Sequence, residues 1–394
     1  MFPPHVVSKN QIWANEPALG AVYTQAEVDA VLAALHESMD PHIGFRAKNR
    51  EMIFEDAFGA YCGAQFAIAY NGAGTALDMV LHCLDLRPGD EVISGALNFV
   101  GAHVSVIRQG GKLVLSEIDP ATLNLDPADV ERRISDRTRA ILVTHMNGMP
   151  ADMKALERLA ARHEHPVFGP PKLIIDAARA CGAEDGEGPV GSRGWATIFS
   201  FQSKKLMTTL GEGGMVTTQD VNLAKRLRRL RSFGKNEEWG SNYKMTKLQA
   251  AVGLVQLRRL DAMNMKRIKL AQQRNELLRH VAELTLPPEF QGREHVYYRY
   301  ALLVPPAWAG ELRNEVMLTL NRNHGIGSIV ADPPTYLTHP WIREHIGSHS
   351  LPLAESVAER LFCPALHPLM EHEENESMCE AIIATVQSIS RTAN

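Results

Sequence analysis

The chain has 394 residues, enough for two or three domains of about 150 residues each, one of them with a large hydrophobic core. Hydrophobic residues make up 45% and charged residues 22%, a composition typical of globular rather than disordered proteins. The 41 Lys and Arg nearly balance the 45 Asp and Glu, so the net charge of -4 carries no polybasic signature for nucleic acid or anionic lipid. Small-molecule chemistry is the expectation that remains.

The five cysteines are an odd number and include no Cys-x-x-Cys pair, so we expect buried free thiols. The first residues lack the basic segment and apolar run of a secretory signal. No apolar stretch reaches the roughly 18 residues that a membrane span needs. These features predict a cytoplasmic protein with no membrane partner.

Helices and strands alternate along the first half of the chain. Thr24-Gln25-Ala26-Glu27 has the pattern of a capping box and predicts the start of a helix. Strands are expected at 65–70, 91–93, 112–115, 140–144 and 172–176, with helices at 75–84, 98–108, after 127 and at 152–163. This alternation predicts βαβ units and a mainly parallel α/β sheet covered on both faces.

The pattern changes after short predicted strands at 196–201 and 215–218. Helical periodicity marks 223–230 and a long segment from Thr246 to about Arg279. A strand-like run at 296–304 and terminal helices then predict a smaller α+β lobe. We therefore divide the chain into an N-terminal arm (1–24), a large domain (25–265) and a small C-terminal domain (266–394).

Three predicted strands are followed by loops with candidate functional residues. Ligands of open α/β sheets bind at the carboxyl ends of the strands. The loop 71–75 contains Gly72 and Gly74 before a helix, an arrangement suited to phosphate, although a simple tight turn is the alternative. Leu77 stands where a dinucleotide fingerprint requires a third glycine. Asp176 ends an apolar strand and could be a helix cap or a functional acid, and Phe99 could be core or ligand-facing.

The segment 200–214 carries the strongest signal, because Lys204 and Lys205 lie between an apolar strand and the glycine-rich run Gly211-Glu-Gly-Gly214. A partly buried lysine can serve as a Schiff-base nucleophile, whereas a surface pair beside a turn is the alternative. A phosphate loop, a strand-end acid, an aromatic ring and a loop lysine together are the parts that hold pyridoxal phosphate.

The order of these motifs resembles the DegT/StrS family of sugar aminotransferases. The motifs are Gly74-Thr75, Asn98-Phe99, 148–153, 176–178, Ser200-Phe201, Lys205, Gly211–Gly214 and 242–249. Members of that family are pyridoxal-phosphate enzymes with the aspartate-aminotransferase fold. The resemblance runs from about Val28 to Pro368, and the spacing from Lys205 to Gly211 is its most diagnostic part.

The resemblance implies a role for each matching residue. Lys205 would bind the cofactor covalently and move protons, and Asp176 would pair with the pyridine nitrogen. Phe99 would stack on the ring. The phosphate would be held by Gly74, Thr75 and Ser200, and by Asn242 of the partner in a homodimer with shared active sites.

Two positions depart from the family pattern. Arg179 stands where Gln or His is usual near the phenolic oxygen of the cofactor. As a cofactor-binding residue it would favour the phenolate, and the alternatives are that it recognises a carboxylate or points away. Leu206 replaces a common Asn. Lys205 itself argues against the sugar-dehydratase relatives, which have His there.

No metal site is predicted, because His163 and His165 lack a Cys or Asp to complete a ligand set. The basic run 225–231 is expected to form a solvated or dimer-facing helix.

The favoured interpretation is an aminotransferase that uses glutamate or glutamine to aminate a keto-sugar, often nucleotide-linked, or a keto-cyclitol. Its pathway would make amino sugars, antibiotics or other natural products, or surface polysaccharide. One alternative is a pyridoxal-phosphate enzyme that dehydrates or aromatises an amino-hydroxy ring. A cofactor-sensing regulator is disfavoured, because no DNA-binding segment precedes the cofactor domain.

Overall fold

The computed structural model describes residues 13–46, 48–347 and 349–393. Its helices are α1 (Gln25–Ser38), α2 (Lys48–Cys62), α3 (Ala73–His82), α4 (Val100–Arg108), α5 (Pro127–Arg133), α6 (Met153–Arg162), α7 (Val221–Leu230), α8 (Lys247–Leu278), α9 (Glu311–His324), α10 (Thr335–Thr338), α11 (Pro340–Ile346), α12 (Pro352–Arg360) and α13 (His372–Ala393). Its strands are β1 (Phe66–Tyr70), β2 (Glu91–Gly95), β3 (Lys112–Ser116), β4 (Thr138–Thr144), β5 (Lys172–Asp176), β6 (Ala196–Ser200), β7 (Gly214–Thr218), β8 (Leu302–Leu303), β9 (Ser328–Ile329) and β10 (Leu361–Pro364).

The larger lobe is built on a seven-stranded sheet with the order β1-β7-β6-β5-β4-β2-β3. Strands β3, β2, β4, β5 and β6 pair in parallel, and β7 runs antiparallel between β6 and β1. The carboxyl ends of every strand except β7 therefore lie at one edge of the sheet. This arrangement confirms the predicted mainly parallel α/β sheet.

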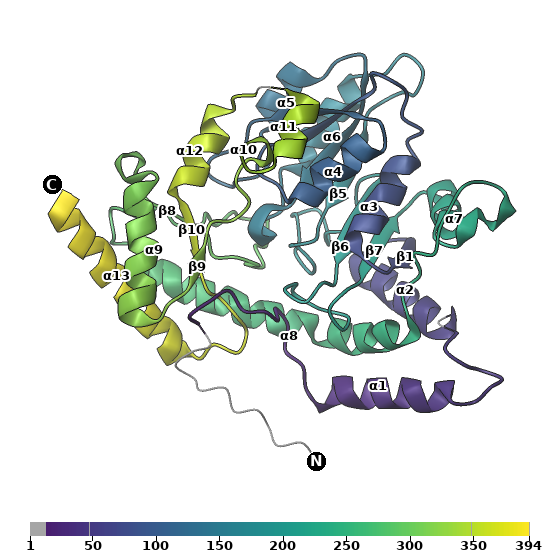
Figure 1. The fold of residues 1–394 in the computed structure, drawn as a ribbon, viewed down its shortest axis with the longest axis horizontal. Coiled ribbons are helices and arrows are strands. Elements are labelled where there is room, and N and C mark those ends of the chain that lie inside the picture. The colour runs from purple at the N-terminus through teal and green to yellow at the C-terminus, as the bar shows by residue number, and fades with distance from the viewer. Residues whose placement is uncertain (1–12, 47, 348, 394) are drawn as a thin grey trace.

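Helices cover both faces of this sheet, as Figure 1 shows. Residues of α3, α4 and α7 share one hydrophobic cluster with the sheet, and residues of α2, α6 and the first half of α8 share the other. The strands are almost entirely buried, since both faces carry apolar side chains against a helical layer. The sheet is thus a rigid support for the loops at its edge.

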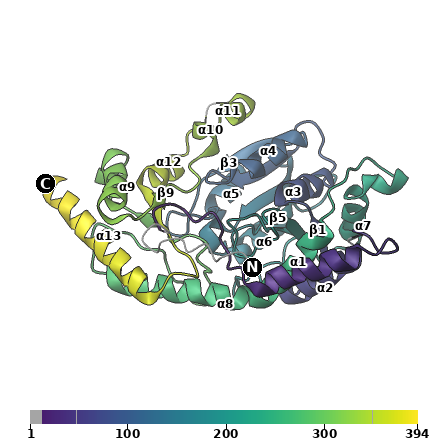
Figure 2. The same ribbon diagram turned by 60° about the horizontal axis from the view of Figure 1, so that its bottom comes forward.

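The smaller lobe is connected to the larger one by α8, which runs along the base of both lobes in Figures 1 and 2. This helix begins at Thr246, where the long helical segment was predicted to start; Thr246 and Gln249 form a capping box, and the helix continues for 32 residues. Its second half packs with α9, α13 and the small sheet β8-β10-β9 around a separate hydrophobic cluster. The boundary predicted between residues 265 and 266 lies inside α8.

Most predicted elements are confirmed, one predicted strand is wrong and one helix was not predicted. Helix α2 was missed by the sequence analysis. The strand predicted at 296–304 is wrong, since only Leu302–Leu303 is a strand. Tyr297 has a left-handed φ of 46°, and the amides of Val296 and Arg299 donate to the carbonyls of Gly148 and Asn147. Tertiary hydrogen bonds to a loop of the large domain therefore replace strand pairing here.

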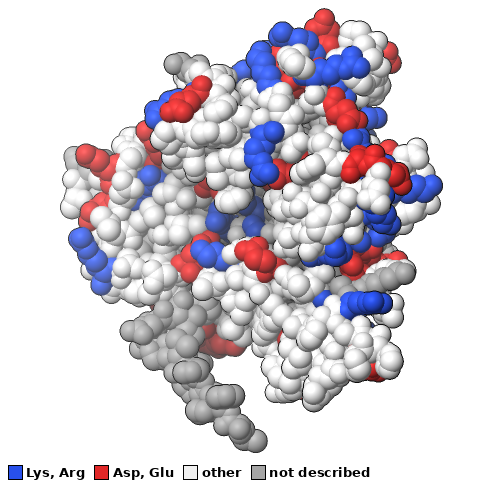
Figure 3. Space-filling view, turned by 45° about the vertical axis from the view of Figure 1, so that its right-hand side comes forward, with Lys and Arg blue, Asp and Glu red and all other residues white. Residues whose placement is uncertain are grey.

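The basic run 225–231, expected to form a solvated or dimer-facing helix, lies on α7 and its C-cap and pairs with acidic side chains of the same chain. Arg228 and Arg231 both pair with the buried carboxylate of Glu55, and Arg226 pairs with Asp85 and Glu238. These in-chain partners neutralise the run. Figure 3 shows charges of both signs interspersed over one face of the molecule and within its central hollow.

Two further expectations concern the cysteines and membranes. All five cysteines are free, and all are buried except Cys83, which is half-buried. Among the residues that the structure describes, no helix is long and apolar enough to span a bilayer.

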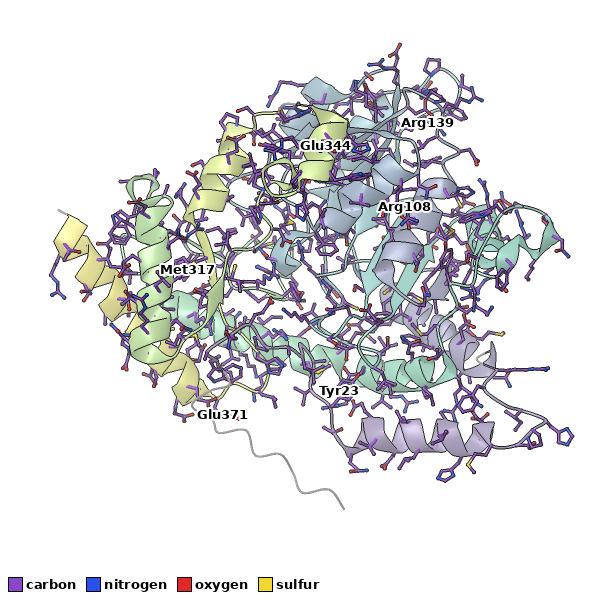
Figure 4. The ribbon with its side chains drawn as sticks, viewed as in Figure 1. Tyr23, Arg108, Arg139, Met317, Glu344 and Glu371 are labelled. Atoms are coloured by element: carbon purple, nitrogen blue, oxygen red, sulfur yellow. The ribbon has the colours of Figure 1, made fainter. Side chains whose placement is uncertain are left out.

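The described part of the N-terminal arm lies between the two lobes. The amide of Gly20 donates to the carbonyl of Ser203 at 2.8 Å, beside the two lysines. The carbonyl of Trp13 accepts from the amide of Gly327 in the small lobe. Tyr23, labelled in Figure 4 where α1 approaches α8, accepts a hydrogen bond from the Thr208 hydroxyl. The arm therefore contacts both the lysine loop and the small lobe.

Candidate active site

The phosphate-type loop lies at the carboxyl edge of the sheet. It follows β1 and leads into α3, whose N-cap Gly72 has no side-chain cap, so the first backbone N–H groups are free for an anion. The glycine-rich run lies against the same loop. A Cβ on Gly214 would lie only 2.6 Å from the amide nitrogen of Ala73, which explains why glycine is needed there. Gly74 and Thr75 lie in the first turn of α3.

Asp176 is the last residue of β5, at the centre of this edge. Its Oδ1 accepts from the amide of Ala178 at 3.0 Å, and the chain continues in a turn rather than a helix. The helix-cap alternative is therefore wrong. One carboxylate oxygen serves the local turn, and the side chain as a whole is only half-buried, so Asp176 remains able to accept from a ligand.

The two adjacent lysines point to different partners. Lys204 Nζ forms an ion pair with Glu16 of the arm. Lys205 Nζ instead lies 4.9 Å from the centre of the Tyr298 ring. Only Lys205 thus faces the site, from a turn in which its amide donates to the carbonyl of Gln202.

Burial lowers the pKa of Lys205 from its usual range, and Arg179 and Arg299 lower it further. Tyr298 and Asp176 act in the opposite direction but do not offset the burial. A lower pKa increases the fraction of neutral amine near pH 7, and the neutral amine is the nucleophile. This environment suits a lysine that forms a covalent bond to a carbonyl group.

The remaining predicted residues lie around the same edge. Phe99 is the N-cap residue of α4 and is 61% exposed, so the core alternative is wrong. Ser200 ends β6 and is buried opposite Gly214 in the sheet register. The side chain of Asn242 is exposed, while the carbonyl of the next residue, Tyr243, accepts from the amide of Asn71 in the same chain. The backbone beside Asn242 therefore contacts the first residue of the phosphate-type loop in its own chain.

The structure places the side chain of Arg179 against the small lobe. Its guanidinium is buried and forms an ion pair with Asp332 of the small lobe at 2.9 Å. It therefore points toward the small lobe, although it remains close enough to lower the pKa of Lys205. Leu206 is buried in the hydrophobic core.

Four charged or aromatic residues at this site escaped the sequence analysis: Glu16, Tyr298, Arg299 and Asp332. Arg299 binds both Asp332 and Glu16, at 2.8 and 3.1 Å, and its guanidinium carbon lies 5.2 Å from the centre of the Tyr298 ring. The only sequence signal for any of these four residues was the position of Arg299 within the aromatic run 297–300. No group of three or more metal-binding side chains occurs in the described ranges.

The sheet order, the lysine at its carboxyl edge and the second lobe define an α/β enzyme with the aspartate-aminotransferase fold. The model of the DegT/DnrJ/EryC1/StrS aminotransferase family matches residues 26–383. The chain belongs to this family and is an aminotransferase.

Similar proteins agree with this assignment. The chain is 36% identical over 312 residues to a GDP-perosamine synthase of Caulobacter vibrioides, covering 77% of this chain and 81% of the relative. It is 32% identical to the dTDP-3-amino-3,4,6-trideoxy-alpha-D-glucose transaminase of Streptomyces venezuelae, covering 92% and 94%. A structure of DesV from S. venezuelae, in complex with a ketimine intermediate, has a TM-score of 0.84 at 31% identity and covers 92% and 95%.

Proposed function

We propose that the protein uses pyridoxal phosphate bound to Lys205 to transfer an amino group from glutamate or glutamine to a keto-sugar carried on a nucleotide. The observation that carries this proposal is the orientation of Lys205 into a strand-end site that also contains Asp176 and the free N-terminus of α3. The names of the relatives support the sugar acceptor, since two of them act on sugars linked to GDP or dTDP.

The residues at the sheet edge fit the cofactor. A Cβ on Gly74 would have no atom within 4 Å, so the N-terminus of α3 has room for a phosphate group. Ser200 ends the strand beside this loop and would supply a hydroxyl to the phosphate. Phe99 presents an exposed ring that can pack on a pyridine face.

Pyridoxal phosphate, when bound, would supply a carbonyl carbon for the amino group and a ring that accepts electrons. Asp176 would hold a proton on the ring nitrogen through an ion pair. Lys205 would accept a proton from the amino-bearing carbon of the donor and would deliver it to the former carbonyl carbon of the cofactor. Lys204 would take no part in proton transfer, because Glu16 holds it away from the site.

We also propose that the enzyme is a homodimer with shared active sites, in which Asn242 contacts the phosphate in the partner subunit. Helix α1 supports this proposal, because Val28, Leu32, Leu35 and Met39 form a stripe of exposed apolar side chains, 39–70% exposed. Phe233 and Trp239, which precede Asn242, are also 63% and 58% exposed. A second copy of the chain would cover these side chains.

The experiment is to reconstitute the protein with pyridoxal phosphate, reduce it with borohydride and locate the adduct by mass spectrometry. We expect the adduct on Lys205 in the wild type and in Lys204→Ala, and none in Lys205→Ala. Single amino acids are then added while visible absorbance is followed. Conversion of the bound cofactor to its amine form by glutamate or glutamine supports the proposal, whereas no conversion by any amino acid refutes it.

A further inference from the structure

An ionic chain passes Tyr298 and lies beside the proposed catalytic lysine. It runs from Lys204 to Glu16, Arg299, Asp332 and Arg179. Its members come from the arm, both lobes and the loops after β5 and β6. Lys204 is adjacent to Lys205 in the sequence, and Arg179 lies three residues after Asp176. The ionic chain therefore begins and ends in the large lobe, close to these two site residues in the sequence.

Asp332 is the central link. A single oxygen, Oδ2, contacts Arg299 Nη1 at 2.8 Å and Arg179 Nη2 at 2.9 Å. The side chains of all three residues are at most 16% exposed, so water screens their charges weakly. Without this carboxylate, two buried guanidinium groups would face each other without a shared counter-ion.

The backbone of Asp332 is held in an unusual conformation. Its φ is 44°, in the left-handed region that non-glycine residues rarely adopt, and Pro333 follows it. Such strain persists where the surrounding structure holds a residue in place, and it concentrates at functional sites. Here the strain places a carboxylate of the small lobe against two arginines.

The field of this chain reaches Lys205. The charged and titratable groups that act on its ammonium are Tyr298, Arg179, Asp176 and Arg299, and Lys205 in turn acts on the carboxyl of Asp332. Burial raises the pKa of Asp332, but Arg179, Arg299 and Lys205 outweigh it and hold the pKa below its usual range. Asp332 is therefore an anion near neutral pH.

We propose that Asp332 is a positioning residue for catalysis, which holds Arg179 against the small lobe and offsets the positive charge of both arginines at Lys205 Nζ. The proposal concerns a residue outside the motifs of the sequence and rests on the proposed function of Lys205.

The test uses Asp332→Asn, Arg179→Gln and the double variant. Asparagine keeps the size of the side chain and tolerates positive φ, so only the charge is lost. The matched control is Asp85→Asn, because Asp85 also has positive φ, 49°, and also pairs with an arginine, Arg226, but Lys205 is not among the charges that act on its carboxyl.

The readout is the pH dependence of Lys205 acetylation by acetic anhydride in the cofactor-free full-length protein, followed by mass spectrometry. Loss of the carboxylate should lower the midpoint by about one pH unit, the size expected for one charge within about 10 Å at low exposure. Arg179→Gln should raise the midpoint, because a cation that disfavours the ammonium is removed. The double variant should return near the wild-type value, and Asp85→Asn should leave it unchanged.

An unchanged midpoint in folded Asp332→Asn would overturn the proposal. If that variant does not fold, Arg179→Gln is the test. An acetylation midpoint of Lys205 that stays the same or falls in Arg179→Gln would contradict the proposed electrostatic effect. In the reconstituted holoenzyme, the visible absorbance should titrate with shifts of the same sign. Absence of cofactor on Lys205 in the wild type would refute the proposed function, whereas equal acetylation midpoints refute only the role of Asp332.

Discussion

Gly20 is the point at which the N-terminal arm meets the backbone of the lysine loop, and its replacement by alanine should displace the arm. A Cβ on Gly20 would lie 2.2 Å from the carbonyl oxygen of Lys204 and 2.5 Å from that of Lys205. Both contacts are with backbone, so no side-chain rotation relieves them. The hydrogen bond from the Gly20 amide to Ser203 and that from Arg267 to the Gly20 carbonyl would be strained together.

The magnitude follows from these contacts. Overpacking costs about 1–3 kcal/mol and each weakened hydrogen bond about 1 kcal/mol. The lower entropy of the unfolded alanine chain returns about 0.4–1 kcal/mol. We therefore expect Gly20→Ala to lower the free energy of unfolding by about 2–4 kcal/mol and to increase the rate of Lys205 acetylation, because the covering arm moves.

Urea denaturation and acetylation followed by mass spectrometry would measure the two effects. The control is Gly95→Ala, whose Cβ would meet its nearest neighbour, Leu125 Cδ1, at an ordinary 3.6 Å. It should change stability by less than Gly20→Ala. A Gly20→Ala protein as stable as the wild type, with unchanged acetylation, would refute the idea that the arm is held against the lysine loop.

Three further predictions concern the site and its support. Asp176→Asn should keep the fold but slow the half-reaction with the amino donor by about 10²-fold or more, because the amide supplies no anion for the ring nitrogen. Single-turnover kinetics measure this rate. An unchanged rate would mean that Asp176 only stabilises the local turn through its hydrogen bond from Ala178. Asn242→Asp and Lys205→Ala, each impaired alone, should recover about a quarter of wild-type activity when subunits exchange randomly, since half the dimers are mixed and each has one intact site. Verified exchange without recovery would assign Asn242 to its own chain. Asp129 is buried, but hydrogen bonds from Arg133, the Glu117 amide and Ser116 lower its pKa from 3.8 to about 2. A depressed pKa stabilises the fold above pH 3.8 and less as the pH falls toward 2, so Asp129→Asn should cost about 2 kcal/mol at pH 7 and less at pH 3, measured by urea denaturation. An equal cost at both pH values would contradict this linkage.

The sequence by itself determined the elements whose signals are local. The capping boxes at Thr24 and Thr246 begin α1 and α8, because a side-chain oxygen and a following Glu or Gln satisfy the same backbone amides in any context. The alternation of strands and helices predicted the parallel sheet, because each parallel strand needs a crossover connection to the next, and that connection is usually a helix. The candidate lysine, acid and phosphate-type loop were found because each lies at the end of a strand. The roles of these residues stay predictions.

Only the tertiary structure decided how charges from distant segments combine. Nothing near Arg179 in sequence indicates that its partner is Asp332, more than 150 residues away and on the other lobe. Nothing in the adjacent pair of lysines shows that Glu16 binds Lys204 and leaves Lys205 facing Tyr298. Local propensity acts over a few residues, whereas Coulomb interactions and burial depend on distance in space. The environment of the reactive lysine is therefore a property of the folded chain.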